Sequence, residues 1–418
     1  MRNKKTKILF EPASCGLSHV MRCLALAQGL RKDQFMIGFA LKNTLVELVK
    51  SYGYSDIYVI SDEYDKPIDY FDRLKILCAP LHIKQCLKDE LEVINKFKPD
   101  LIISDFRLTS GISAEMAGVC WGSFIHSFEP LSGRKPAEET LRQAGMTDFS
   151  VENINDILRK YAKNFHPFLG KTKFPQTVDI WQLLISPNFS FIPCIPTISK
   201  LSKQKDNIHY VGPVTVALDK NIGNRSNSIN LNVDIDTNIP LVYVRMNFVS
   251  YKYRDTVKKC LETLIETFKE SKIQVILSTG LSIPNVHSPN IKITSFVPSN
   301  IIMKINKVIV VGTGSHTTSL ETLAQGLPLL ILPFGFERLL NAQRLKETGA
   351  SEWLTPEQVS REQIEEIITK LLNQHSYKSA AEKQQRIIQE YGGLNTASKL
   401  LNEYMIKYGF INRDLEVM

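Results

Sequence analysis

Short apolar runs alternate along this chain with stretches in which apolar residues recur at helical spacing. In the first half, a run ending at Phe10 is followed by helical spacing from Val20 to Leu30. The second half has a helical stretch at 256–268 and apolar runs at 273–277, 291–293, 308–311 and 329–332. Continuous runs of this kind are typical of strands buried on both faces. The pattern predicts an α/β protein with mainly parallel sheets.

The alternation is interrupted once, at 217–238, a segment rich in Asn, Asp and Ser. Such a composition is typical of a linker. A chain of 418 residues is also longer than one ordinary core requires. We therefore expect domains at 1–216 and 239–390. After Gly392 and Gly393, apolar residues at helical spacing predict a terminal helix within 391–418.

Glycines and hydroxyl side chains follow the apolar run at 308–311. The run ends at Gly312, and the segment up to Ser319 brings small residues, hydroxyl groups and backbone N–H groups just before a helical pattern. A helix N-terminus with unpaired N–H groups and a favourable dipole binds phosphate readily. Ser and Thr also cap helices without any ligand. The loop is therefore either a phosphate site or a plain helix cap.

The sequence after this loop resembles a known family. The segment SLETLAQGLPLLILP, at 319–333, and the following PFGFERLLNAQRL resemble the donor-binding box of family 1 glycosyltransferases, with matches at Glu321, Gly326, Pro328, Pro333, Asn341 and Ala342. The resemblance implies the glycosyltransferase B fold, in which two Rossmann-like domains face a cleft. It implies that Glu321 takes the ribose hydroxyls of a nucleotide sugar, and that 391–418 packs back on the first domain.

The amino-terminal motif resembles the same family. Its Gly-His-x-x-Pro reads here as Ser18, His19 and, three residues later, Arg22, so the Gly and the Pro are replaced. The resemblance implies that His19 is the general base, for which an imidazole pKa near neutrality is suitable. Asp105, at the end of a predicted buried strand, would orient it. Alternatively, His19 packs at a helix start and Asp105 only forms a turn.

Several departures from the family pattern concern the donor. The phosphate-binding His is replaced by Thr313, with His316 three residues later, and the Asp-Gln pair that grips sugar hydroxyls is replaced by Glu337 and Arg338. Arg245 begins the segment that replaces Ser-Phe-Gly-Ser; it is either a phosphate partner or a strand-end surface charge. An arginine can grip a carboxylate or phosphate with two hydrogen bonds, whereas a charge pair at a helix start can equally be exposed.

The resemblance thus predicts an inverting, metal-independent hexosyltransferase that uses a UDP- or dTDP-sugar and no other cofactor. Its donor-binding residues would be Arg245, Asn247, Phe296, Val297, Gly314, Ser315, His316, Thr317, Thr318, Glu321, Glu337 and Arg338. The acceptor would be a small hydrophobic or amphipathic molecule, and the protein a monomer or homodimer. Ser18 to Ala27 also resembles the nucleotide-sugar hydrolase of pseudaminic acid synthesis, which uses water as acceptor. A catalytically inactive nucleotide-sugar-binding protein is the third alternative.

Net charge and cysteine content limit the partners and the cellular compartment that we expect. The net charge of +8 comes from Lys and Arg spread along the chain, so we expect no nucleic-acid partner, while peripheral contact with an anionic membrane stays open. The seven cysteines form no Cys-x-x-Cys pair, and neither a signal peptide nor a membrane-spanning run is visible, so we expect the reducing cytoplasm. Asp234 and Asp236 have a metal-ligand spacing but belong to the linker, so we expect no metal.

Overall fold

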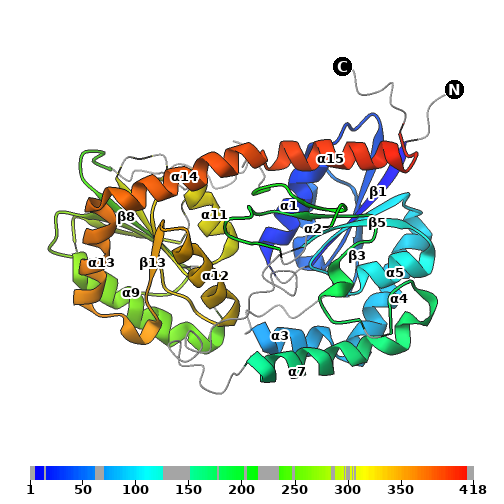
Figure 1. The fold of residues 1–418 in the computed structure, drawn as a ribbon, viewed down its shortest axis with the longest axis horizontal. Coiled ribbons are helices and arrows are strands. Elements are labelled where there is room, and N and C mark those ends of the chain that lie inside the picture. The colour runs from blue at the N-terminus through cyan, green and yellow to red at the C-terminus, as the bar shows by residue number, and fades with distance from the viewer. Residues whose placement is uncertain are drawn as a thin grey trace.

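The structure is a computed structural model of the chain, and it contains two parallel sheets with helices around them (Figure 1). It describes residues 5–13, 16–61, 70–125, 151–176, 178–201, 205–214, 235–246, 250–283, 288–295, 297, 302–303, 305 and 307–411. The predicted fold class is confirmed, because each sheet is a layer of parallel strands in an α/β arrangement.

The first sheet has the strand order β3-β2-β1-β4-β5-β6-β7, and its neighbouring strands pair in parallel. Its strands are β1 (Thr6–Pro12), β2 (Phe35–Leu41), β3 (Asp56–Val59), β4 (Leu101–Asp105), β5 (Cys120–Phe124), β6 (Phe189–Ile192) and β7 (Ile208–Tyr210). Every residue of β4 is buried, as the continuous apolar run predicts. The accompanying helices are α1 (Leu17–Gln28), α2 (Val46–Ser51), α3 (Tyr70–Leu77), α4 (Pro80–Phe97), α5 (Ser110–Ala117) and α7 (Val151–Ala162).

The second sheet has the order β10-β9-β8-β11-β12-β13 and is also parallel. Its strands are β8 (Leu241–Arg245), β9 (Gln274–Ser278), β10 (Ile291–Thr294), β11 (Val308–Gly312), β12 (Leu329–Ile331) and β13 (Ser351–Trp353). Its helices are α9 (Arg254–Phe268), α11 (His316–Ala324), α12 (Phe336–Glu347) and α13 (Arg361–Asn373). Ser360 caps α13 by accepting a hydrogen bond from the backbone N–H of Gln363.

Two helices at the carboxyl end link the sheets. Helix α14 (His375–Tyr391) lies over the second sheet and α15 (Leu394–Lys407) lies along the first (Figure 1). Gly393, between them, has φ +58°, and a Cβ atom there would stand 2.4 Å from the Pro213 carbonyl oxygen, so a glycine is required. In α15, Tyr404 stacks on Phe189 at a centroid distance of 4.7 Å. The second domain is thereby tied to the first.

Other expectations from the sequence lie partly outside the described residues. Most of the predicted linker does, so the domain boundaries stay predictions. The described cysteines are all free, namely Cys23, Cys78, Cys86, Cys120, Cys194 and Cys260. Among the described helices, none combines the length and apolarity needed to cross a membrane.

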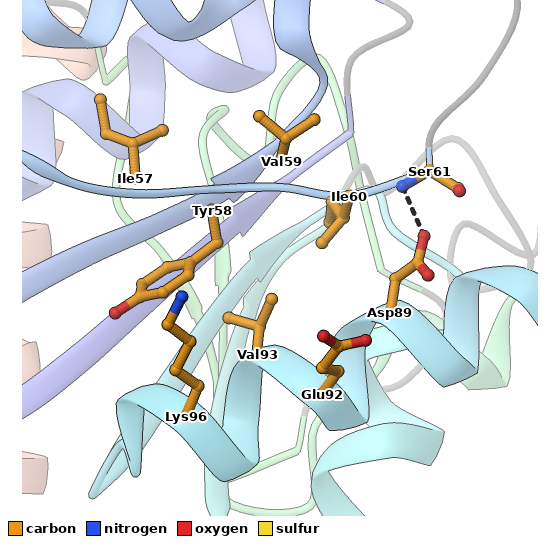
Figure 2. A pocket seen from close by; sticks show the side chains of 9 residues that line it. All are labelled: Ile57, Tyr58, Val59, Ile60, Ser61, Asp89, Glu92, Val93 and Lys96. Atoms are coloured by element: carbon orange, nitrogen blue, oxygen red, sulfur yellow. Dashed lines mark hydrogen bonds between the residues drawn. The ribbon is translucent and has the colours of Figure 1, made fainter.

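A pocket of about 440 Å³ lies at the outer edge of the first sheet, between β3 and α4 (Figure 2). Tyr58 and Ile60 point toward α4, whereas Ile57 and Val59 point to the opposite side of the strand. The backbone N–H of Ser61 donates to Asp89 at 2.7 Å, closing one end. None of the predicted site residues lines this pocket, so it is separate from the candidate active site.

Candidate active site

His19 and Asp105 meet at the carboxyl edge of the first sheet. Strand β4 ends at Asp105, which lies opposite Pro12 of β1, and the loop after β1 leads into α1, whose first turn carries His19. The Nδ1 atom of His19 lies 2.7 Å from Oδ1 of Asp105. Asp105 is fully buried, whereas the His19 side chain retains 12% of its exposure. The predicted pair is therefore in contact, with the imidazole reaching the surface.

Arg22 completes this cluster. Its Nε donates to Asp105 Oδ2 at 2.7 Å and its Nη2 to Oδ1 at 3.0 Å, while Nη2 also lies 2.9 Å from His19 Nδ1. Burial by itself would raise the pKa of Asp105, but Arg22 and His19 together lower it below its ordinary value. The carboxylate is therefore ionised. In the sequence Arg22 stands out only as a departure from the family motif, and its spacing of three residues from His19 is the signal for a shared helix face.

The backbone next to Asp105 is strained. Phe106 has φ +56°, which is unusual for a bulky residue, and its ring stacks on the His19 imidazole at a centroid distance of 5.5 Å. Strain of this kind persists only where surrounding contacts enforce it, and it is frequent at functional sites. Phe106 therefore supports one face of the imidazole.

The donor loop lies between β11 and α11 in the second domain. Gly314 has φ +79°, and a Cβ atom there would stand 2.8 Å from the Arg338 carbonyl oxygen. Asn341 Nδ2 donates to the Gly314 carbonyl at 3.0 Å, and Ser315 Oγ donates to Thr318 Oγ1 at 2.9 Å. The loop is thus packed directly on the start of α12, and its second glycine is required by both backbone and space.

Two of the predicted departures from the family contact each other. Arg338 Nη1 donates to the hydroxyl of Thr313, the residue in the place of the phosphate-binding His. The pKa of Arg338 is lowered, first by burial and also by the charge of Arg73, while Glu337 acts in the opposite direction. Arg73 belongs to α3, and Phe71 of that helix packs on Phe336 of α12 with ring centroids 5.4 Å apart. Helix α12 therefore begins against the first domain.

His316, at the first position of α11, lies close enough to the cluster of the first domain for the charges there to act on its pKa. Its pKa is lowered to about 3, mainly by burial, and further by the charges of Arg22 and Arg344, against the opposing effect of Asp105. The imidazole is therefore neutral at physiological pH and can donate only one hydrogen bond. Arg344 is a buried residue of α12, and the sequence analysis did not include it among the candidate site residues. The influence of Arg22 on His316 indicates that the predicted donor and catalytic residues share one site.

Glu321 forms an ion pair with Arg245. Arg245 Nη1 lies 2.7 Å from Glu321 Oε2, and each side chain keeps about a quarter of its exposure, 25% and 26%. Arg245 is the last residue of β8 and Glu321 belongs to α11, so the ion pair joins the strand to the helix. In the sheet, Arg245 lies opposite Gly312. Arg245 is thus neither a lone surface charge nor committed to phosphate in this structure.

The remaining predicted donor residues are spread over the same edge. Thr317 is partly exposed in the first turn of α11, and Glu337 lies in the first turn of α12. The carbonyl oxygen of Val297 accepts a weak hydrogen bond from the Tyr243 hydroxyl at 3.4 Å. Asn247 and Phe296 lie outside the described residues. Within the described part of the chain, no group of three or more His, Cys, Asp and Glu could hold a metal ion.

Comparisons with known proteins agree with this arrangement. Residues 269–390 match the family described as erythromycin biosynthesis protein CIII-like, C-terminal domain. NDP-glycosyltransferase YjiC of Bacillus subtilis (strain 168) is 23% identical over 403 residues, covering 93% of this chain and 95% of YjiC. The glycotransferase of kitacinnamycin has a TM-score of 0.73 at 13% identity, covering 96% of this chain and 99% of that one.

A further similar structure is glycosyltransferase VinC in complex with dTDP, with a TM-score of 0.65 at 16% identity, covering 96% of this chain and 98% of that one. The solved structures have the same two-domain fold, and the relatives match this chain over almost its whole length. With the domain match, these findings show the glycosyltransferase B fold, and they make the chain similar to macrolide-related glycosyltransferases.

Proposed function

We propose that the protein is an inverting, metal-independent glycosyltransferase that moves a sugar from a UDP- or dTDP-sugar to a hydroxyl group of a small hydrophobic or amphipathic acceptor. The observation that carries this proposal is the 2.7 Å contact between His19 Nδ1 and the ionised Asp105. A proton on Nδ1 satisfies that carboxylate, which leaves Nε2 with its lone pair. His19 is then the base that accepts the proton of the acceptor hydroxyl.

The transfer is a single displacement. As Nε2 takes the proton, the acceptor oxygen forms a bond to the anomeric carbon, and the bond from that carbon to the diphosphate oxygen breaks. Attack opposite the leaving group inverts the anomeric configuration. The leaving diphosphate is stabilised by the N–H groups that begin α11 and by the hydroxyls of Ser315, Thr317 and Thr318.

The rest of the donor occupies the same edge of the second sheet. Glu321 accepts hydrogen bonds from the ribose hydroxyls, Phe296 and Val297 contact the base, and Glu337 and Arg338 face the sugar or its phosphates. A thymidine diphosphate is supported by VinC, which has a similar fold and is described in complex with dTDP, and a uridine diphosphate is the alternative. Asn247 lies after β8 and would complete this site.

Hydrolysis of the nucleotide sugar is the second candidate. It is favoured by Arg22, which belongs to the segment resembling the pseudaminic acid pathway hydrolase and contacts both members of the catalytic pair. In that case water replaces the acceptor hydroxyl. Incubating the protein with its nucleotide sugar and no acceptor separates the two, because a hydrolase consumes the donor in full whereas a transferase leaves most of it intact.

The base assignment is tested by His19→Ala. Thermal-shift screening against nucleoside diphosphates and nucleotide sugars first identifies the donor. The variant should then lose at least about a hundredfold in turnover, the usual contribution of a general base, while its nucleotide affinity stays unchanged. Full turnover in His19→Ala would refute the role of His19. Normal nucleotide binding without any turnover in the unmodified protein would instead support an inactive binding protein.

A further inference from the structure

The loop that follows Asp105 is anchored by a buried glutamate that the proposed mechanism does not use. This residue is Glu90 of α4, which has no exposed surface. We infer that Glu90 is a positioning residue, which holds the loop between β4 and α5 in the conformation that places Asp105 against His19. The inference rests on the proposed function, because it needs Asp105 and His19 to be the catalytic pair.

One carboxylate oxygen of Glu90 accepts two hydrogen bonds from this loop. Its Oε1 atom accepts from Nε of Arg107 and from the hydroxyl of Thr109, each at 2.5 Å. Arg107 and Thr109 are also buried. A buried donor that loses its partner has no water to replace it, so these bonds are costly to break. Glu90 therefore fixes the loop at both Arg107 and Thr109.

The strained backbone at Phe106 lies between these anchors and a contact of Asp105. The Asp105 carbonyl oxygen accepts a hydrogen bond from the backbone N–H of Ala13 at 2.8 Å, on the other side of Phe106. A φ of +56° is unfavourable for a bulky side chain, and such a backbone relaxes when the contacts beside it are released. Relaxation would displace the Asp105 carboxylate and the Phe106 ring, both of which contact His19.

A second buried glutamate binds the end of the same loop, but it does not supply the charge. Ser110 Oγ donates to Oε2 of Glu11 at 2.6 Å. Burial, and next the charge of Glu90, raise the pKa of Glu11 well above its ordinary value, against the opposing effects of Ser110 and Arg107. The neutral form of Glu11 is therefore favoured. The ion pair that holds the loop is the one between Arg107 and Glu90.

The residue next to Glu90 holds the neighbouring loop of the first sheet. Asp89 accepts a hydrogen bond from the backbone N–H of Ser61, after β3, at 2.7 Å (Figure 2). Arg107 Nη2 donates to the Ser61 carbonyl at 3.0 Å, so the loops after β3 and β4 are also joined to each other. Because Glu90 has no exposed surface, it cannot contact a substrate. Its effect on the reaction is therefore transmitted through the loop.

A double-mutant cycle on turnover tests this inference. Glu90→Gln keeps the shape and removes the charge, so we expect kcat to fall about tenfold to a hundredfold, the effect of displacing a catalytic group by up to about 1 Å, with the donor KM unchanged. In Asp105→Asn, measured at high enzyme concentration, the same substitution should lower kcat by less than about threefold, because the carboxylate that it positions is already lost. Glu352→Gln, which removes a glutamate paired with two lysines in the second domain, is the matched control and should leave kcat unchanged.

Equal losses in the two backgrounds would overturn the inference, because a glutamate that only stabilises the fold acts independently of Asp105. An unchanged kcat in folded Glu90→Gln would overturn it as well. If the buried, unpaired charge of Arg107 prevents Glu90→Gln from folding, Thr109→Val decides, because it removes one anchor and keeps the ion pair. Its kcat should fall about threefold to tenfold, the range for one hydrogen bond, and an unchanged kcat would then overturn the inference.

The cycle also separates this inference from the proposed function. Full turnover in Asp105→Asn would refute the catalytic pair, and the positioning role with it. A slow Asp105→Asn beside a folded Glu90→Gln of normal turnover would refute the positioning role alone.

Discussion

The two halves of the site differ in how far they are assembled before any ligand binds. In the first domain, Asp105 is fully buried and Arg22 nearly so, and every contact among them and His19 is within hydrogen-bond distance. In the second domain, Arg245 and Glu321 each keep about a quarter of their exposure, 25% and 26%. The catalytic cluster is thus mostly buried and hydrogen-bonded within itself, whereas the Arg245–Glu321 pair of the donor half is still partly exposed to a ligand.

In both halves of the site, arginines stand where the family pattern has other residues. Each of three arginines replaces a different residue, and each contacts a predicted site residue or, in one case, another departure from the family pattern. Arg22 holds Asp105, Arg338 holds Thr313, and Arg245 holds Glu321. The three arginine substitutions therefore all lie within the candidate site. Because a charge pair gains more when it is desolvated, we expect the arginine of the buried half to matter most and that of the exposed half least.

Asp105→Asn should have the largest effect, because it disrupts the buried half at its centre. The amide cannot stabilise the protonated Nδ1 as a carboxylate does, so we expect turnover to fall by about three to four orders of magnitude, with donor affinity unchanged. Steady-state kinetics with the identified donor measures this. Asp100→Asn is the control, because Asp100 directly precedes β4, at the end away from Asp105, and accepts a hydrogen bond from the Lys7 N–H. Turnover above a tenth of normal would contradict the role of the Asp105 carboxylate.

The sequence predicted the buried half better than the exposed one. Continuous apolar runs identified β1 and β4 and put Asp105 at the carboxyl end of a strand, and the resemblance to the family implied its pairing with His19. The contacts of the three arginines could not be predicted. They depend on side-chain direction and on register, such as that of Arg245 opposite Gly312, which no local pattern encodes.

Arg338→Gln should have an intermediate effect, because Arg338 is partly buried and contacts the donor loop. If Arg338 takes over from the lost phosphate-binding His, the variant should bind a nucleoside diphosphate about tenfold to a hundredfold more weakly, the range for one charge-assisted hydrogen bond. Calorimetry with UDP and with dTDP measures this, and Arg361→Gln at the exposed start of α13 is the control. A loss seen only with the nucleotide sugar would place Arg338 at the sugar instead.

Arg245→Ser, which restores the family residue, should have the smallest effect. A partly exposed ion pair is worth roughly 1 kcal/mol or less, so we expect nucleoside diphosphate affinity to fall about fivefold at most. The contact between Arg245 and Glu321 also predicts which part of the nucleotide loses affinity. Arg245 orients Glu321 toward the ribose, so its removal should reduce the preference for UDP over 2′-deoxy-UDP rather than weaken both equally. Glu321→Gln should abolish that preference. If Arg245→Ser weakens both ligands by the same factor, Arg245 acts on the phosphates, and the exposed half is organised around charge rather than around Glu321.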